Sequence, residues 1–138
     1  MEHCVEWKPF YSVGDASLDA EHQRLLGLID DLCTAVMAGH GQDRVREILD
    51  RLSDYTMTHF DHEERVMLSC GYPNIEAHMT MHDEMRRRTR GFRAEPDLVV
   101  ERDLLQFLKE WWVRHIQNQD KGYAPYLHAL NPRPIKMA

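Results

Sequence analysis

Two pairs of potential metal ligands are spaced four residues apart in this chain. His59 precedes Glu63 by four positions, and His78 precedes His82 by the same interval. Because a helix advances about 100° per residue, side chains four apart point the same way from successive turns. If both stretches are helical, each presents a pair of nitrogen or oxygen ligands on one face. Imidazole and carboxylate together suit Fe, Zn, Mn, Cu or Ni.

Two further segments offer the same types of side chain. His22 lies near the start of an apolar periodic run, and His115 and Asp120 are five apart. Helical spacing alone would favour Gln119, four residues after His115, as the partner of that histidine. Four segments therefore offer ligands, and carboxylates on such segments can bridge two metal ions inside a helical bundle.

Helical periodicity defines the elements that must position these residues. Apolar residues recur at helical spacing in four segments, which glycine, proline or short polar stretches separate. The four predicted helices span residues 18–38, 43–70, 74–92 and 98–121. Their short connections force neighbours to be antiparallel, which predicts an all-α, up-down-up-down four-helix bundle. We expect one domain over residues 1–138, with an extended N-terminal arm (1–17) and an irregular C-terminal tail (122–138).

The depth of each candidate ligand along its predicted helix is the same. The candidates lie near the starts of the first and third helices and near the ends of the second and fourth, so an antiparallel bundle brings them to one end. The set is His22, His59, Glu63, His78, His82, His115 and Asp120. Seven side chains are too many for one ion, whereas two ions bridged by two carboxylates would use them all. Burying these groups without a cation would be costly. Iron fits best, and spacing leaves Mn and Zn open.

Composition limits the class of protein. The chain has 17 basic and 23 acidic residues, and this net charge of −6 argues against nucleic acid and anionic membranes as partners. No apolar run approaches the roughly 20 residues that span a bilayer, and the N-terminus lacks an apolar signal region. The cysteines, Cys4, Cys33 and Cys70, give neither a zinc pattern nor a disulfide framework. We therefore expect a cytoplasmic protein without membrane insertion, and a monomer.

The ordered ligand pattern resembles that of hemerythrin, specifically a single-domain bacterial hemerythrin. A lone H-x-x-x-E or H-x-x-x-H motif is weak, but the ordered set of seven is specific, and the resemblance covers nearly the whole chain. The matching segments are Trp7-Lys8-Pro9, Leu18-Asp19-Ala20-Glu21-His22, His59-Phe60-Asp61-His62-Glu63, His78-Met79-Thr80-Met81-His82, Trp111 to Ile116, and Asp120-Lys121-Gly122-Tyr123.

The resemblance implies a non-haem, carboxylate-bridged Fe-O-Fe centre with two irons per chain that binds O2 reversibly. One iron would take His78, His82 and His115, and the other would take His22 and His59 and keep an open position. Glu63 and Asp120 would bridge the two. The resemblance and the charge needed for bridging both favour Asp120 over Gln119, so we expect the helix to distort there. The protein would carry, store or deliver O2, with an O2-consuming enzyme as a candidate partner, and would not be an enzyme.

Residues next to the ligands are candidates for an O2 pocket. They are Leu25, Phe60, Trp111, Trp112 and Ile116. Trp112 stands where the hemerythrin pattern usually has an aliphatic residue. His62 falls about 60° off the face of His59, so we expect it to be solvated. The alternatives are a di-iron ferroxidase or peroxidase and a sensor of O2, NO or redox state. Five imidazoles among seven ligands favour binding, because di-iron oxidases on bundles mostly use carboxylates.

Overall fold

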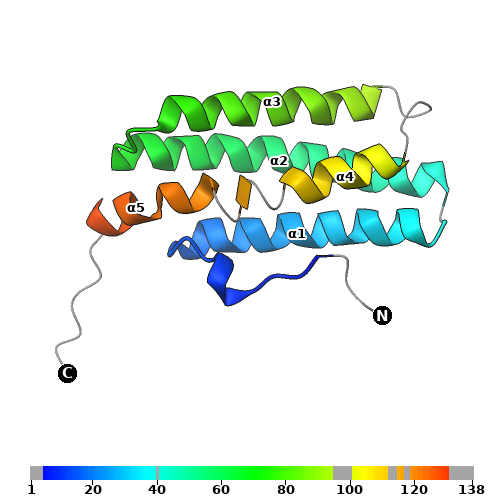
Figure 1. Cartoon of the computed structure of the whole chain (residues 1–138), viewed down its shortest axis with the longest axis horizontal. Coiled ribbons are helices and arrows are strands. Elements are labelled where there is room, and N and C mark those ends of the chain that lie inside the picture. Colours follow the sequence, from blue (N-terminus) through cyan, green and yellow to red (C-terminus); the bar gives the residue numbers. More distant parts are fainter. Residues whose placement is uncertain (1–4, 40, 95–100, 112–114, 117–118, 131–138) are drawn as a thin grey trace.

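The computed structural model describes residues 5–39, 41–94, 101–111, 115–116 and 119–130, and every regular element within these ranges is helical. The elements are η1 (Pro9–Tyr11), α1 (Ala16–Met37), α2 (Gln42–Cys70), α3 (Ile75–Ala94), α4 (Glu101–Trp111), η4 (Asp120–Gly122) and α5 (Ala124–Leu130). Figure 1 shows α1, α2 and α3 as long helices with their axes aligned. The shorter elements α4, η4 and α5 follow one another in line and form the fourth member of the bundle. The all-α four-helix bundle predicted from the sequence is confirmed.

Local signals fix the ends of the helices that lie near the candidate ligands. The Asp15 side chain accepts a hydrogen bond of 2.9 Å from the Leu18 amide and so caps α1. At the end of α2, Gly71 adopts the left-handed conformation with φ 69°, and the Tyr72 amide donates to the Met67 carbonyl. Glycine accepts this conformation without strain from a Cβ atom, so α2 stops here and α3 turns back beside it.

Two apolar clusters hold the bundle together. The larger runs along its interior and includes Leu25, Ile29, Leu52, Phe60 and Leu108. The smaller lies where the arm, α1, the end of α2 and the C-terminal segment meet, and it consists of Val13, Leu18, Met67 and Tyr123. The backbone amide of Val13 also donates to the Asp19 carboxylate at 2.8 Å. The described part of the arm is therefore fastened to α1.

The C-terminal segment is more regular than the sequence suggested. Residues 122–138 are predicted as an irregular tail with one short turn around Tyr126 and Leu127, and the structure extends that turn to the short helix α5 (Ala124–Leu130). Pro125 is the second residue of that helix, where the absence of an amide hydrogen removes no helical hydrogen bond. Ala124 and Leu127 pack against the smaller cluster. This contact, and not a long apolar period, accounts for the helix.

The fourth predicted helix departs from α-helical geometry near the candidate ligands. A continuous helix is expected from residue 98 to 121. Within that span the structure describes α4 over Glu101–Trp111, and it places His115 and Ile116 in a π-helical turn. Asp120 then begins the 3-10 turn η4. A π turn closes after five residues where an α-helix closes after four, so it brings positions five apart into register. The expected distortion is confirmed.

Two further features concern cysteines and membranes. The sequence gives no sign of a disulfide, yet Cys33 is disulfide-bonded, and its partner lies outside the described residues. Cys70 carries a free thiol. The scattered spacing of three cysteines cannot reveal which of them the fold brings together. Among the described residues, no helix has both the length and the apolar character needed to cross a bilayer.

Candidate metal centre

Seven side chains with nitrogen or oxygen ligands meet in the interior at one end of the bundle. Each of them is at most 3% exposed. They come from α1 (His22), α2 (His59, Glu63), α3 (His78, His82), the π turn (His115) and η4 (Asp120). The structure thus brings together all seven residues that the sequence singled out. Gln119, the alternative by helical spacing, is exposed, whereas Asp120 is fully buried.

The seven residues form two groups that share both carboxylates. Within each group the potential ligand atoms all lie within 4.8 Å of one another. The larger group is Glu63, His78, His82, His115 and Asp120. The smaller group is His22, His59, Glu63 and Asp120. We call them the three-histidine half and the two-histidine half. This sharing is what a pair of carboxylate-bridged ions requires.

Glu63 divides its two oxygens between the halves. Its Oε2 lies 3.1 Å from His22 Nε2 and 3.3 Å from His59 Nε2. Its Oε1 lies 3.1 Å from His78 Nε2 and 2.9 Å from His82 Nε2. A carboxylate that faces one set of nitrogens with each oxygen can bind two ions at once.

Asp120, in η4, divides its oxygens in the same way. Its Oδ2 lies 3.0 Å from His22 Nε2, on the side of the two-histidine half. Its Oδ1 lies 3.0 Å from the Nε2 atoms of both His78 and His115. Two carboxylates on different elements therefore have the same division of oxygens.

Several of these atoms approach closely without forming hydrogen bonds. Both carboxylate oxygens of Asp120 and the Nε2 of His59 are buried without a hydrogen-bond partner in the described structure. By contrast, the Nε2 atoms of His82 and His115 are within hydrogen-bond distance of one another, at 3.1 Å. Buried polar atoms are rarely left unsatisfied. Their convergence fits a cation between them, and mixed imidazole and carboxylate ligands suit a transition metal.

The protonation behaviour of the same groups indicates a site that attracts positive charge. Burial lowers the pKa of His22, but the carboxylates of Asp120 and Glu63 outweigh it and raise that pKa to about 10. The same balance raises the pKa of His78 to about 9. Burial raises the pKa of Glu63, yet the surrounding histidines hold it well below its usual range. Protons on the histidines thus compensate the buried carboxylates in the metal-free protein.

The two-histidine half is braced by a carboxylate that the sequence analysis did not single out. His59 Nδ1 lies 2.7 Å from Glu21 Oε1, and His62 Nδ1 lies 2.6 Å from Glu21 Oε2. Burial raises the pKa of Glu21, but its contacts with the two histidines lower it overall. The expectation that His62 is simply solvated is wrong, because its side chain is only 30% exposed and contacts Glu21 across the α1–α2 interface.

The three-histidine half has a corresponding brace. His82 Nδ1 lies 2.8 Å from Glu64 Oε2, and the same oxygen accepts a 2.7 Å hydrogen bond from Arg86. Arg86 also bonds Asp83 at 2.8 Å. Neither Glu21 nor Glu64 lies on a ligand stripe, so helical spacing does not reveal them. Their one available signal is that each directly adjoins a candidate ligand in the sequence.

Tyr123 completes the surroundings of Glu63. Its hydroxyl donates a 2.8 Å hydrogen bond to Glu63 Oε2, and the side chain is fully buried. Burial and the charges of Glu63 and Asp120 raise its pKa well above the usual value. The phenol therefore stays a donor and holds the carboxylate in place. It contacts the oxygen that faces the two-histidine half.

Four of the five residues predicted to line an O2 pocket are described, and two of them contact ligand histidines through their rings. Leu25, Phe60, Trp111 and Ile116 are all buried. The Phe60 ring stacks on His82 with centroids 3.8 Å apart, and the Trp111 ring lies parallel to that of His115 at 6.0 Å. Trp112 lies outside the described residues, so its predicted role in the pocket stays a prediction.

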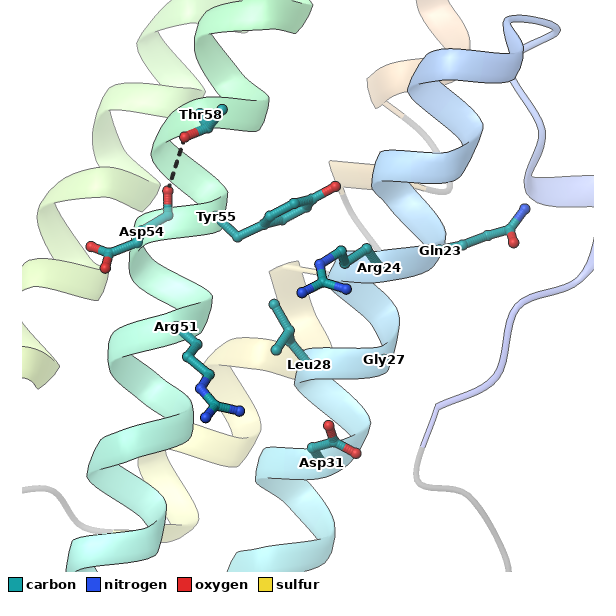
Figure 2. A pocket seen from close by; sticks show the side chains of 9 residues that line it. All are labelled: Gln23, Arg24, Gly27, Leu28, Asp31, Arg51, Asp54, Tyr55 and Thr58. Carbon is teal, nitrogen blue, oxygen red and sulfur yellow. Dashed lines mark hydrogen bonds between the residues drawn. The ribbon is translucent and has the colours of Figure 1, made fainter.

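A surface groove of about 730 Å³ lies between α1 and α2 and holds none of the seven residues. Figure 2 shows Arg24 on α1 and Arg51 on α2 reaching into it from opposite sides. The Arg24 guanidinium lies 5.6 Å from the centre of the Tyr55 ring. Its lining is exposed and of mixed charge, so the residues suited to metal chemistry are those of the buried cluster.

Comparisons with known proteins agree with this geometry. A family model described as the hemerythrin HHE cation-binding domain matches residues 13–127. A bacteriohemerythrin of Pseudomonas aeruginosa is 32% identical over 125 residues, covering 89% of this chain and 80% of the relative. Myohemerythrin-1 of Phascolopsis gouldii is 31% identical over 117 residues, covering 85% of this chain and 89% of the relative.

Solved hemerythrin structures have the same fold as this chain. A wild-type hemerythrin superposes with a TM-score of 0.81 at 26% identity, covering 90% of this chain and 98% of that one. A hemerythrin with a leucine-to-tyrosine substitution gives a TM-score of 0.83 at 25% identity, covering 91% and 98%. Because the matched family model covers residues 13–127, which include every residue of the buried cluster, the chain belongs to the hemerythrin family.

Proposed function

We propose that this protein binds O2 reversibly at a pair of iron ions held by the seven buried side chains. The observation that carries the proposal is the division of oxygens in Glu63 and Asp120, each of which faces both halves of the cluster. One ion alone would leave one oxygen of each carboxylate unused. His78, His82 and His115 would hold one iron, and His22 and His59 would hold the other.

The unequal number of histidines supports binding at one particular ion. The three-histidine half supplies one more imidazole than the two-histidine half, while both share the same carboxylates. His22 and His59 would therefore give their ion one protein ligand fewer, which would leave room for an external ligand. When bound, two ferrous ions would supply the electrons needed to hold O2.

The surrounding residues favour release of the ligand over further chemistry. Phe60 and Ile116 are fully buried, and they help to exclude water from the centre. Tyr123 keeps its proton and bonds Glu63, so it acts as a positioning group. A dry, nitrogen-rich environment disfavours peroxidase or ferroxidase chemistry, which needs protons delivered to the reacting oxygen.

The test is a cycle of oxygenation. Protein loaded anaerobically with Fe²⁺ should be almost colourless, gain a visible charge-transfer band on exposure to O2, and lose that band when O2 is removed under argon. The cycle should repeat with little loss of amplitude. Irreversible oxidation in the first exposure, with steady consumption of added Fe²⁺, would instead support the ferroxidase alternative and overturn the proposal.

A further inference from the structure

The histidine ligands differ in what holds the ring nitrogen that faces away from the cluster. In the two-histidine half, His59 directs Nε2 towards Glu63 and Nδ1 towards Glu21, at 2.7 Å. His22 also directs Nε2 towards the carboxylates, but its Nδ1 has no hydrogen-bond partner in the described structure. Among the described residues, Glu21 is therefore the side chain that holds an outward-facing ring nitrogen in this half.

Glu21 is itself fixed by a second histidine. Its other oxygen lies 2.6 Å from His62 Nδ1, so one carboxylate on α1 binds two imidazoles on α2. The side chain of Glu21 is 22% exposed and that of His59 is fully buried. The pair thus connects a buried ligand to the protein surface in two contacts. A carboxylate held at both oxygens has little freedom to turn away from His59.

We propose that Glu21 is a positioning residue for the ion held by His22 and His59, and that His62 fixes Glu21 for this role. The inference rests on the proposed function for the identity of that ion. A carboxylate at Nδ1 fixes the tautomer that leaves Nε2 free to bind metal, sets the plane of the ring, and increases the basicity of the ligand. Glu21 does not touch the metal, and it acts through His59.

The primary test is anaerobic metal binding by Glu21→Gln. Glutamine keeps the shape of the side chain and can still accept a hydrogen bond from His59, but it lacks the charge. Titration of Fe²⁺ against a competing chelator should show one of the two ions bound about 10–100-fold more weakly, the range typical of lost outer ligands. Affinity for the other ion should change far less. Equal affinity for both ions in Glu21→Gln and wild type would overturn the inference.

Two matched variants separate positioning from a general loss of charge or stability. Glu64→Gln removes the corresponding carboxylate behind His82, and it should weaken the other ion instead. Glu47→Gln removes an equal charge from the exposed surface of α2, where it pairs with Arg51, and both affinities should stay as in wild type. If all three variants weaken the same ion, the effect is a general one and the assignment to Glu21 is wrong.

Cobalt gives a readout that a purely structural role would not change. The visible d–d bands of bound Co²⁺ report the geometry around each ion. Glu21→Gln should alter the bands of one Co²⁺, while the midpoint of thermal unfolding of the metal-free protein stays close to that of wild type. A lowered midpoint with unchanged Co²⁺ bands would show that Glu21 only joins α1 to α2.

Variants of His62 test the second contact. His62→Gln should bind two ions at saturating metal but should weaken the same ion as Glu21→Gln, by a smaller factor. Combining His62→Gln with Glu21→Gln should add little to the effect of Glu21→Gln alone, because both act through one contact. Additive losses would contradict the role given to His62. None of these measurements involves O2, so a failed oxygenation cycle would leave them interpretable.

Discussion

The two halves of the cluster are built alike, but their outer carboxylates contact different basic side chains. Behind the two-histidine half, Glu21 is held by His62, whose side chain is 30% exposed. Behind the three-histidine half, Glu64 is held by Arg86, whose side chain is 12% exposed and which also pairs with Asp83. Arginine is always charged and bonds several acceptors at once, whereas histidine is a weaker and more variable partner.

The difference matches the work that each half would do. Under the proposed function, the ion with three histidines would need a constant environment, and Arg86 supplies a fixed charge over the Phe60 ring, 5.3 Å from its centre. The ion with two histidines would accept and release a ligand. Its brace combines an imidazole with a carboxylate nearer the surface. The two halves therefore share the pattern of ligand and outer carboxylate and differ in the side chain that holds the carboxylate.

The largest loss of iron is expected from removing the charge of Glu63, a carboxylate that both halves share. Glu63→Gln keeps the shape but removes the charge that both ions require, so the iron content should fall from two per chain to about one or none, well beyond the loss expected for an outer residue. Iron analysis after reconstitution measures this. His62→Ala, which alters one brace only, should still reach full loading. If His62→Ala empties the site and Glu63→Gln does not, the assignment of Glu63 as a ligand and of His62 as an outer residue is wrong.

The metal-free protein should respond to alkaline pH. In the folded state the pKa of His22 is raised to about 10 and that of His78 to about 9, both above the unfolded value of about 6.5. The folded protein therefore binds more protons than the unfolded one between pH 6.5 and 10. Its free energy of unfolding should be greatest near pH 6.5 and should fall as the pH rises through this window.

Metal should remove that dependence, because the ions replace the protons. Urea unfolding of metal-free and metal-loaded protein at pH 6.5, 8 and 9.5 measures the contrast. We expect a steady decline without metal and a nearly constant free energy with it. A metal-free protein that becomes more stable as the pH rises would show that the buried carboxylates are not compensated by the histidines.

A smaller effect is expected from Tyr123, which bonds the Glu63 oxygen on the side of the two-histidine half. Tyr123→Phe keeps the buried ring and removes the hydrogen bond to a charged group, so we expect the free energy of unfolding to fall by about 1.5–3 kcal/mol. Chemical denaturation at pH 7 checks this. Tyr126→Phe, on an exposed ring of α5, is the control and should change little.

The smallest effect is expected from the brace of the other half. Arg86→Ala removes the charged partner of Glu64 but leaves the bond between Glu64 and His82, so we expect a loss of about 1 kcal/mol in the free energy of unfolding. Arg87→Ala removes an exposed arginine that pairs with Glu84, and it should have almost no effect. Equal losses in the two variants would mean that the Arg86 network is an ordinary surface contact.

The sequence allows the main helices and the buried cluster to be predicted for a clear physical reason. Apolar residues at helical spacing define α1, α2 and α3, and the depth of His22, Glu63 and His78 follows from antiparallel packing. The candidate ligands lie on the same helical faces as the apolar core residues. The helical spacing of these faces therefore predicts both the fold and the cluster.

Other features depend on contacts between distant segments. The helix has a π turn at His115 and Ile116, and Asp120 is buried in the cluster where an ideal helical period would place Gln119. Glu21 and Glu64 lie off the ligand stripes and acquire their roles only when a neighbouring helix presents an imidazole. The helix α5 is too short for its period to be recognised, and it forms because Leu127 packs on the smaller cluster.

The central claim is that the cluster holds two unlike iron ions, one in each half. Mössbauer spectroscopy of protein reconstituted anaerobically with ⁵⁷Fe²⁺, combined with iron analysis, tests it most directly. The account predicts two irons per chain and two quadrupole doublets of equal area, from one ion with three histidines and one with two histidines and a free position. A single iron per chain, or two irons that give one doublet in every preparation, would contradict it.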